Sequence, residues 1–188
     1  MRNEPKEGKK RNERNKRKGR KENSGSEQNR NKRKLILSWG TVLVWMIVIF
    51  LFSADNAVDS GKKSGFLLGI LRRIFINEQE PARLEYYAFL IRKIAHFSEY
   101  FVFGILVLNA WIQTVVLKEK KRWKVFAGSL ICCVFYAMTD EFHQYFVPGR
   151  FASPKDVLID SLGALTGIVL FSGILLHKER KRIKSSFE

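Results

Sequence analysis

The sequence predicts an all-α integral membrane protein, built as a bundle of four transmembrane helices with both termini cytoplasmic. The 188-residue chain has a formal net charge of +16 and 46% hydrophobic residues, but the charged and the apolar residues lie in different segments. Residues 35–54 carry no charge at all. An uncharged run of about 20 residues is what a helix needs to cross about 30 Å of hydrocarbon. These two observations argue against a soluble globular domain.

The N-terminal segment, residues 1–34, is polar and basic, with 15 Lys and Arg residues against five Asp and Glu. It has no Val, Leu, Ile, Phe, Tyr or Trp to bury, which predicts a disordered cytoplasmic tail. Its place beside the first span favours binding to anionic lipids of the inner leaflet. A plain topology signal is the alternative, and nucleic-acid binding is not favoured because no nucleic-acid-binding fold accompanies the charge.

Four apolar stretches make up a predicted transmembrane domain over residues 35–176, and a second basic tail follows at 177–188. We expect the first span, 35–54, to be retained rather than cleaved, because it exceeds a signal-peptide core and no small-residue cleavage site follows it. The other spans are residues 94–117, 123–142 and 157–176, each long enough to cross a bilayer.

The apolar residues between the first two spans are too few to cross the membrane. Residues 65–76 place their apolar side chains at helical spacing and also carry Arg72 and Arg73. This pattern predicts an interfacial helix on the membrane surface, with a solvated loop and short helix as the alternative.

Lys and Arg counts predict the orientation. The two tails and the loop at 118–124 carry 25 of the 34 basic residues, and the alternate connections carry nine. Positive charge collects on the cytoplasmic side of membrane proteins. We therefore expect a multi-pass protein of the cell membrane with cytoplasmic termini.

Several carboxylates lie inside the predicted spans, where charge is costly and indicates function or pairing. At about 1.5 Å of rise per residue, Glu99, Asp140 and Asp160 each lie about 24–27 Å from the cytoplasmic end of their span. They therefore form one layer just inside the outer boundary. Arg92, His96 and Glu99 share one helix face because they are four and three residues apart.

The start of the fourth span has the pattern of a helix cap. Ser153, Pro154 and Asp156 fit the N-cap, N1 and N3 positions of a capping box. Asp156 therefore either serves only the helix start or belongs to the charged layer with Asp160. The preceding Pro148-Gly149 predicts a tight turn that returns Arg150 toward the acids.

Glycines indicate where the spans approach one another closely. Gly163 and Gly167 form a GxxxG motif within an apolar span, which permits close helix packing. Gly104 and Gly128 could permit close helix packing in the same way.

The polar layer defines the candidate site. Catalytic candidates are His96, Glu99, Asp140, Glu141 and Asp160, and binding candidates are Arg92, Lys93, Tyr100, Gln144, Arg150 and Asp156. In a catalytic site His96 with Glu99 would be the acid/base pair, and Arg92 and Arg150 would hold an anionic group. Lys155 completes the charged cluster, whose members could instead be structural ion pairs.

A metal site is a further alternative for this layer. His96, Glu99, Asp140, Glu141, His143 and Asp160 are residue types that bind metals in helix bundles. The chain has neither an HExxH nor a CxxC motif. We therefore assign no metal and no cofactor from the sequence.

The ordered polar motifs resemble the VanZ-like family. The resemblance covers about residues 90–175 and rests on Arg92-Lys93-x-x-His96-x-x-Glu99-Tyr100, Asp140-Glu141-x-x-Gln144, Pro148-Gly149-Arg150 and Asp156-x-x-x-Asp160-x-x-Gly163. It implies a membrane-embedded protein related to one linked to resistance to teicoplanin, a lipid-bearing glycopeptide. The basic N-terminal segment lies outside the family pattern.

We therefore expect an outward-facing polar site that binds or modifies an amphiphilic or other cell-envelope component. The resemblance adds a link to glycopeptide resistance. The alternative is a non-enzymatic membrane scaffold whose charge cluster is structural. Transport is disfavoured, because acids in one layer near one face do not make a pathway through the membrane.

Overall fold

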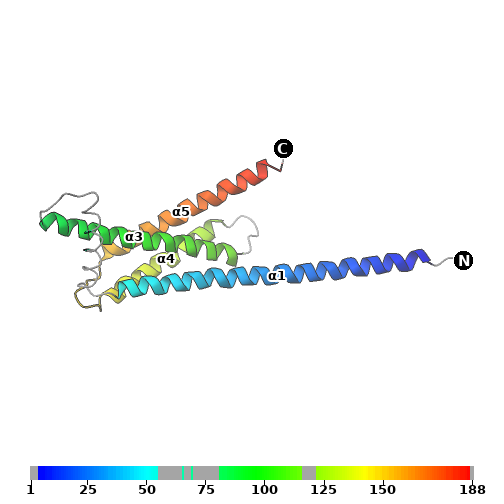
Figure 1. Ribbon diagram of the computed structural model, residues 1–188, viewed down its shortest axis with the longest axis horizontal. Helices are drawn as coiled ribbons and strands as arrows, with labels where there is room; N and C mark the ends of the chain where they lie inside the picture. The colour runs from blue at the N-terminus through cyan, green and yellow to red at the C-terminus, as the bar shows by residue number, and fades with distance from the viewer. Residues whose placement is uncertain (1–3, 55–64, 66–68, 70–80, 116–121, 187–188) are drawn as a thin grey trace.

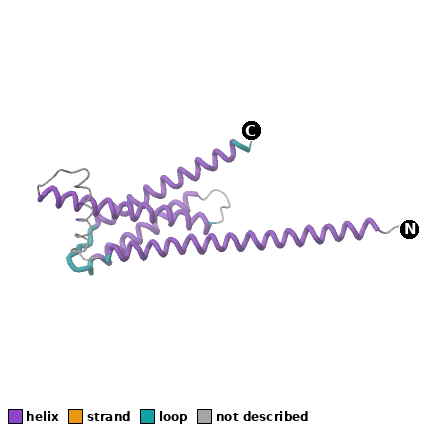
Figure 2. The backbone as a smooth tube through the Cα atoms, in the orientation of Figure 1, coloured by secondary structure: helices purple, strands orange, loops and turns teal. Residues whose placement is uncertain are grey.

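The computed structural model describes residues 4–54, 65, 69, 81–115 and 122–186. These residues form long helices and no strand (Figure 2). The helices are α1 (Glu4–Ser53), α3 (Pro81–Thr114), α4 (Arg122–Gln144) and α5 (Pro154–Lys184). The all-helical fold class is confirmed.

Each helix contains a stretch long and apolar enough to cross a membrane. The four stretches are Ser24–Ser53, Glu85–Thr114, Arg122–Gln144 and Pro154–Lys184, and each includes most of one predicted span. Many large apolar side chains on their outer faces are exposed, among them Leu43, Ile131 and Leu170. Apolar exposure of this extent fits contact with lipid tails rather than with water.

The local structure of the N-terminal segment differs from the prediction. Composition predicts disorder over residues 1–34, whereas α1 begins at Glu4 and runs without a break into the first span. Lys, Arg and Glu are good helix formers, so the chain can continue as a helix beyond the membrane. The predicted boundary between the N-terminal tail, residues 1–34, and the transmembrane domain, residues 35–176, therefore stays a prediction from composition.

The interfacial helix expected at residues 65–76 lies almost entirely outside the described residues. Only Gly65 and Gly69 are described there. The interfacial helix therefore stays a prediction.

Helix α3 is the centre of the bundle, because it packs against α1, α4 and α5. Its most extensive interface is with α5. In Figure 1 both chain termini lie at one end of the bundle, and the C-terminal end of α1 and the α4–α5 connection lie at the other. This arrangement agrees with termini on one side of the membrane, but which side that is stays a prediction.

Glycines let the α3 and α5 backbones touch. A Cβ atom at Gly163 would collide with the carbonyl oxygen of Phe97, and one at Gly167 with that of Phe101. From the other helix, a Cβ at Gly104 would collide with the carbonyl oxygen of Ala164. The GxxxG motif of α5 is therefore a contact surface for α3, as small residues are in membrane helix pairs.

The fourth glycine has a different contact. A Cβ at Gly128 would lie 3.1 Å from the side chain of Trp111, so this glycine of α4 accommodates an indole of α3 rather than a backbone.

Hydrogen bonds from side chains fix α1 against the bundle. The Trp39 indole donates to the Thr114 hydroxyl at 2.9 Å, and the Trp45 indole donates to the Glu99 carbonyl at 2.9 Å. The Tyr136 hydroxyl of α4 donates to the Met46 carbonyl at 2.6 Å. Two of these bonds join α1 to α3, and the third joins α1 to α4.

The glycine contacts predict opposite effects for two Gly→Ala substitutions on α5. Gly163→Ala should lower stability by about 1–3 kcal/mol, because the added methyl group forces the helices apart. Gly173→Ala is the matched control: a Cβ added at this glycine would have no atom within 4 Å, so the gain in helix propensity should leave stability equal or higher. Thermal unfolding of both variants in detergent measures the difference, and equal shifts would contradict the α3–α5 contact.

The expected orientation predicts which engineered cysteines react from outside the cell. In a chain with Cys132 and Cys133 replaced by Ala, Phe151→Cys should react with a membrane-impermeant maleimide in intact cells. Ser186→Cys should react only after permeabilisation. The reverse pattern would show that the termini face outward.

Candidate functional site

The predicted polar residues converge at the end of the bundle that is away from the termini. Helix α3 contributes Arg92, Lys93, His96, Glu99 and Tyr100, helix α4 contributes Asp140, Glu141 and Gln144, the connection contributes Arg150, and α5 contributes Asp156 and Asp160. We call these residues the polar cluster. The burial of three of its five acids distinguishes it from a solvated surface patch, because Asp140 and Glu141 are 3% exposed and Asp160 is completely buried.

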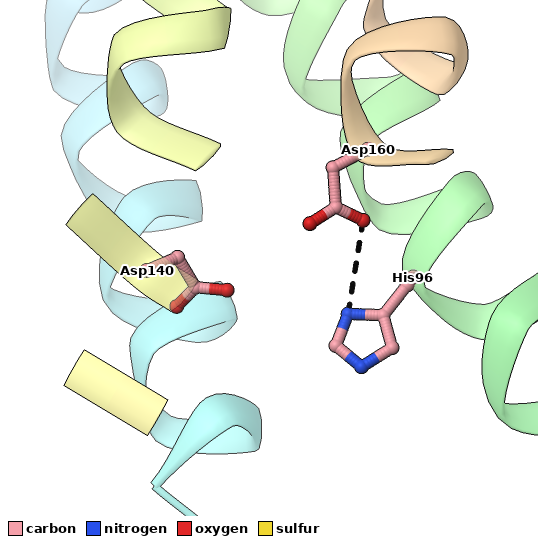
Figure 3. Close-up of side chains that lie close together, drawn as sticks. All are labelled: His96, Asp140 and Asp160. Carbon is pink, nitrogen blue, oxygen red and sulfur yellow. Dashed lines mark ion pairs between the residues drawn. The ribbon is translucent and has the colours of Figure 1, made fainter. Parts of the chain in front are cut away.

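Three helices bring His96, Asp140 and Asp160 together. One ligand-type atom from each lies within 4.8 Å of the others. Figure 3 shows the three side chains facing a common space, with His96 coming from α3, Asp140 from α4 and Asp160 from α5. His96 Nδ1 lies 3.8 Å from Asp160 Oδ1, a distance that allows charge attraction but exceeds a hydrogen bond.

The structure gives His96 a different carboxylate neighbour from the one that the sequence suggests. Spacing along α3 pairs His96 with Glu99 as acid and base. In the structure Asp160 is the acid near the imidazole. The cause is the close α3–α5 contact: Gly163 faces Phe97, so Asp160, almost one turn earlier on α5, lies beside His96.

Asp160 has no hydrogen-bond donor among the described residues. Both of its carboxylate oxygens are buried without a hydrogen bond, and so are His96 Nδ1 and the Tyr100 hydroxyl. Buried polar groups in folded proteins are nearly always hydrogen-bonded, and each exception needs a reason. Unsatisfied groups from two helices at one place are typical of a ligand site.

Asp140 is connected to the α4–α5 connection by a short chain of hydrogen bonds. Gln144 Nε2 donates to Asp140 Oδ2 at 3.3 Å, and Arg150 donates to Gln144 Oε1 at 3.0 Å. The predicted tight turn before Arg150 is present, with Gly149 at φ 77°. Positive φ favours glycine, which explains that residue at the turn.

The predicted capping box at the start of α5 is wrong. Ser153 is the N-cap, but its side chain makes no capping hydrogen bond. Its backbone N–H instead donates to Glu141 Oε2 at 2.9 Å. Asp156 pairs with Lys93 of α3 across the helix interface. Asp156 therefore links two helices rather than only closing its own first turn.

Lys155, His143 and Arg92 differ from the other predicted residues in their surroundings. Lys155 is exposed, and the His143 ring packs against Phe50 with ring centroids 4.3 Å apart. Arg92 makes no hydrogen bond or ion pair with any described residue, and its Nε is buried. A guanidinium without an acidic partner of its own, in a site with acids, is available to an anionic ligand.

Sequence reasoning missed three residues that support the cluster. Ser53, at the end of α1, is 2% exposed and lies beside Asp140. Trp45 and Tyr136 fix α1 against α3 and α4, one turn or so from the cluster, through their hydrogen bonds to backbone carbonyls. Aromatic residues inside apolar spans are indistinguishable from lipid-facing ones by pattern, so only the structure assigns these contacts.

The fold and the polar cluster together define a multi-pass helical membrane protein with a buried charged site at one end. The family model described as VanZ/LLP1 matches residues 38–177, which include most of each of the four spans and the whole cluster. The chain belongs to this VanZ-like family. Comparisons with curated proteins and with solved structures gave no match.

Because the Asp160 carboxylate is buried without a hydrogen-bond partner among the described residues, we expect it to lower the stability of the folded protein. Asp160→Asn, measured with EDTA so that no cation contributes, should raise the free energy of unfolding by about 1–3 kcal/mol, because a neutral amide costs less to bury than a carboxylate. The matched Asp156→Asn variant should lower it, because Lys93 loses its partner. Chemical or thermal unfolding in detergent gives both values. A clear loss of stability in Asp160→Asn would favour a purely structural cluster.

Proposed function

We propose that the polar cluster faces the outer side of the membrane and binds, or acts on, an amphiphilic cell-envelope component with an anionic headgroup. The observation that carries this proposal is the burial of Asp160, His96 Nδ1 and the Tyr100 hydroxyl without hydrogen-bond partners among the described residues. A site retained only for stability would satisfy these groups internally.

The surroundings of the cluster support an amphiphile. Large aromatic side chains around the end of α4 and the following connection are exposed by 65–85%: Phe142, Tyr145, Phe146 and Phe151. We call these four residues the aromatic rim. Aromatic side chains are favoured at the boundary between hydrocarbon and headgroups. An acyl chain could lie along the rim while the headgroup enters the cluster.

Two guanidinium groups in the cluster favour an anionic headgroup. Arg92 has no acidic partner among the described residues, and Arg150 reaches the cluster through Gln144. Guanidinium groups bind phosphate or carboxylate through paired, charge-assisted hydrogen bonds. His96 beside Asp160 supplies an imidazole and a carboxylate for proton transfer if the bound component is also modified.

The alternative of a structural scaffold rests on specific contacts. The Lys93–Asp156 ion pair joins α3 to α5, and Glu141 accepts a hydrogen bond from the N-cap of α5. These contacts give part of the cluster a structural role. They do not involve Arg92, His96 or Asp160, which remain for the ligand.

For the N-terminal segment we propose contact with anionic lipids of the cytoplasmic leaflet. The described side chains from residue 24 to residue 34 are exposed on the extension of α1. Basic side chains next to a span are attracted to such lipids by about 1 kcal/mol each.

Amphiphile binding can be measured with decyl phosphate as the probe. In maltoside micelles containing EDTA, decyl phosphate should raise the unfolding temperature of the wild-type protein in a saturable way, since ligands stabilise the folded state that binds them. Arg92→Gln should lose most of this rise. Arg180→Gln, on the exposed end of α5, is the matched control and should keep it. Equal responses of all three proteins would contradict a headgroup site at Arg92.

The link to glycopeptide resistance is a separate part of the proposal. Expression in a teicoplanin-susceptible bacterium should raise the inhibitory concentration of teicoplanin more than that of a glycopeptide without a lipid chain. His96→Ala and Glu99→Gln at equal membrane levels should lose the effect. No difference between wild type and vector would remove this link without affecting the binding proposal.

A further inference from the structure

We propose that His96, Asp140 and Asp160 bind a divalent metal ion of the zinc or manganese class. This inference deepens the proposed function, and it rests on that function for the view that the cluster receives a headgroup. The metal itself is argued from side-chain geometry within the bundle, independently of which side of the membrane the cluster faces.

The burial of unsatisfied groups is the first argument. Asp160 is completely buried, neither of its oxygens accepts a hydrogen bond from a described residue, and His96 Nδ1 beside it has no hydrogen-bond partner there either. Asp140, only 3% exposed, belongs to the same group of three. Two buried carboxylates close together repel each other strongly in a medium of low dielectric constant. A divalent cation between them would remove this repulsion and would also use the imidazole lone pair.

Geometry is the second argument. The ligand-type atoms lie within 4.8 Å of one another and come from three different helices. With metal–ligand bonds of about 2.1 Å, such atoms are about 3–4 Å apart, so side-chain movements of about an ångström would complete the site. Figure 3 shows the three side chains pointing toward one space, and Asp140 and Asp160 are buried there.

The donor set limits the kind of ion. One imidazole nitrogen with two carboxylate oxygens suits zinc or manganese, whereas magnesium and calcium prefer oxygen ligands alone. Cys132 and Cys133 are on the same helix as Asp140 but outside this group of three. Three protein ligands leave a coordination position for a phosphate or carboxylate oxygen, which is the arrangement of metal sites that bind substrates.

Asp140 also has the support that metal ligands usually have. Gln144 donates to its Oδ2, and Arg150 in turn donates to Gln144. Such outer hydrogen bonds hold a ligating carboxylate in one orientation. The chain Arg150–Gln144–Asp140 would place a guanidinium next to the anion that completes the coordination.

Metal binding can be tested on the full-length protein without any assay of activity. The protein is purified in detergent with its affinity tag removed, stripped with EDTA, and titrated with zinc chloride and manganese chloride by calorimetry. We expect about one ion per chain, with binding weakened at least about tenfold in His96→Gln and Asp160→Asn. His177→Gln, an exposed histidine of α5, is the matched control and should bind like the wild type.

Cobalt gives a positive signal that does not depend on loss of binding. The wild-type protein loaded with Co²⁺ should show the absorption of a nitrogen and oxygen site, without a sulfur-to-cobalt charge-transfer band. Asp160→Cys should create that band, because a thiolate then replaces a ligating carboxylate. The same band in the wild type would assign the metal to Cys132 or Cys133 and overturn the proposal.

Failure of this inference is distinguishable from failure of the proposed function. No zinc or manganese binding, or equal binding in Asp160→Asn, would overturn the metal site even if decyl phosphate still stabilises the wild type in EDTA. Zinc binding that depends on His96 and Asp160 would support the site even if decyl phosphate has no effect.

Discussion

The close contact between the backbones of α3 and α5 fixes the arrangement of the polar cluster. At Gly104, Gly163 and Gly167 the helices approach so closely that a methyl group would meet a carbonyl oxygen. Contacts of this kind set the rotation and the axial position of both helices together, because neither can slide without a backbone collision. They place Asp160 beside His96 and allow Asp156 to reach Lys93.

The same contact explains how a membrane protein can keep several charges inside its helices. Lipid tails do not drive helices together by the hydrophobic effect, so close packing and interhelical hydrogen bonds must hold them. Small residues provide the packing, and Trp39, Trp45 and Tyr136 provide hydrogen bonds that attach α1. Because these contacts hold the bundle together, not every side chain of the polar cluster has to stabilise the fold. Both carboxylate oxygens of Asp160 and the Nε of Arg92 are among the buried atoms left without a hydrogen-bond partner in the part of the chain that the structure describes.

The sequence was sufficient for the features that depend on one helix at a time. Hydropathy located all four spans, and depth along the helices placed Asp140 and Asp160 in one layer with Glu99. The structure brings Asp140 and Asp160 together with His96. The sequence was not sufficient for features that depend on how helices face one another. Spacing along α3 suggested Glu99 as the acid near His96 and could not show that it would be Asp160 of α5. The rotation of α3 against α5 comes from glycine contacts between the two helices.

Local competition explains the error at the start of α5. The Ser-Pro-Lys-Asp pattern fits a capping box, but Glu141 accepts the hydrogen bond of the Ser153 N–H and Lys93 attracts Asp156. Both partners come from other helices, and no pattern within residues 153–156 contains them. At the start of α5, contacts with other helices override a local pattern. In the N-terminal extension of α1, by contrast, helix propensity rather than tertiary contact accounts for the structure.

The central claim is that the space between His96, Asp140 and Asp160 holds a ligand rather than a self-sufficient set of ion pairs. The most direct measurement is a high-resolution experimental structure of the protein purified with its native lipids, with anomalous X-ray data collected at the zinc and manganese absorption edges. We predict density between the three side chains with an anomalous peak, and headgroup density extending toward Arg92. Side chains hydrogen-bonded only to one another, with no density between them, would contradict the central claim.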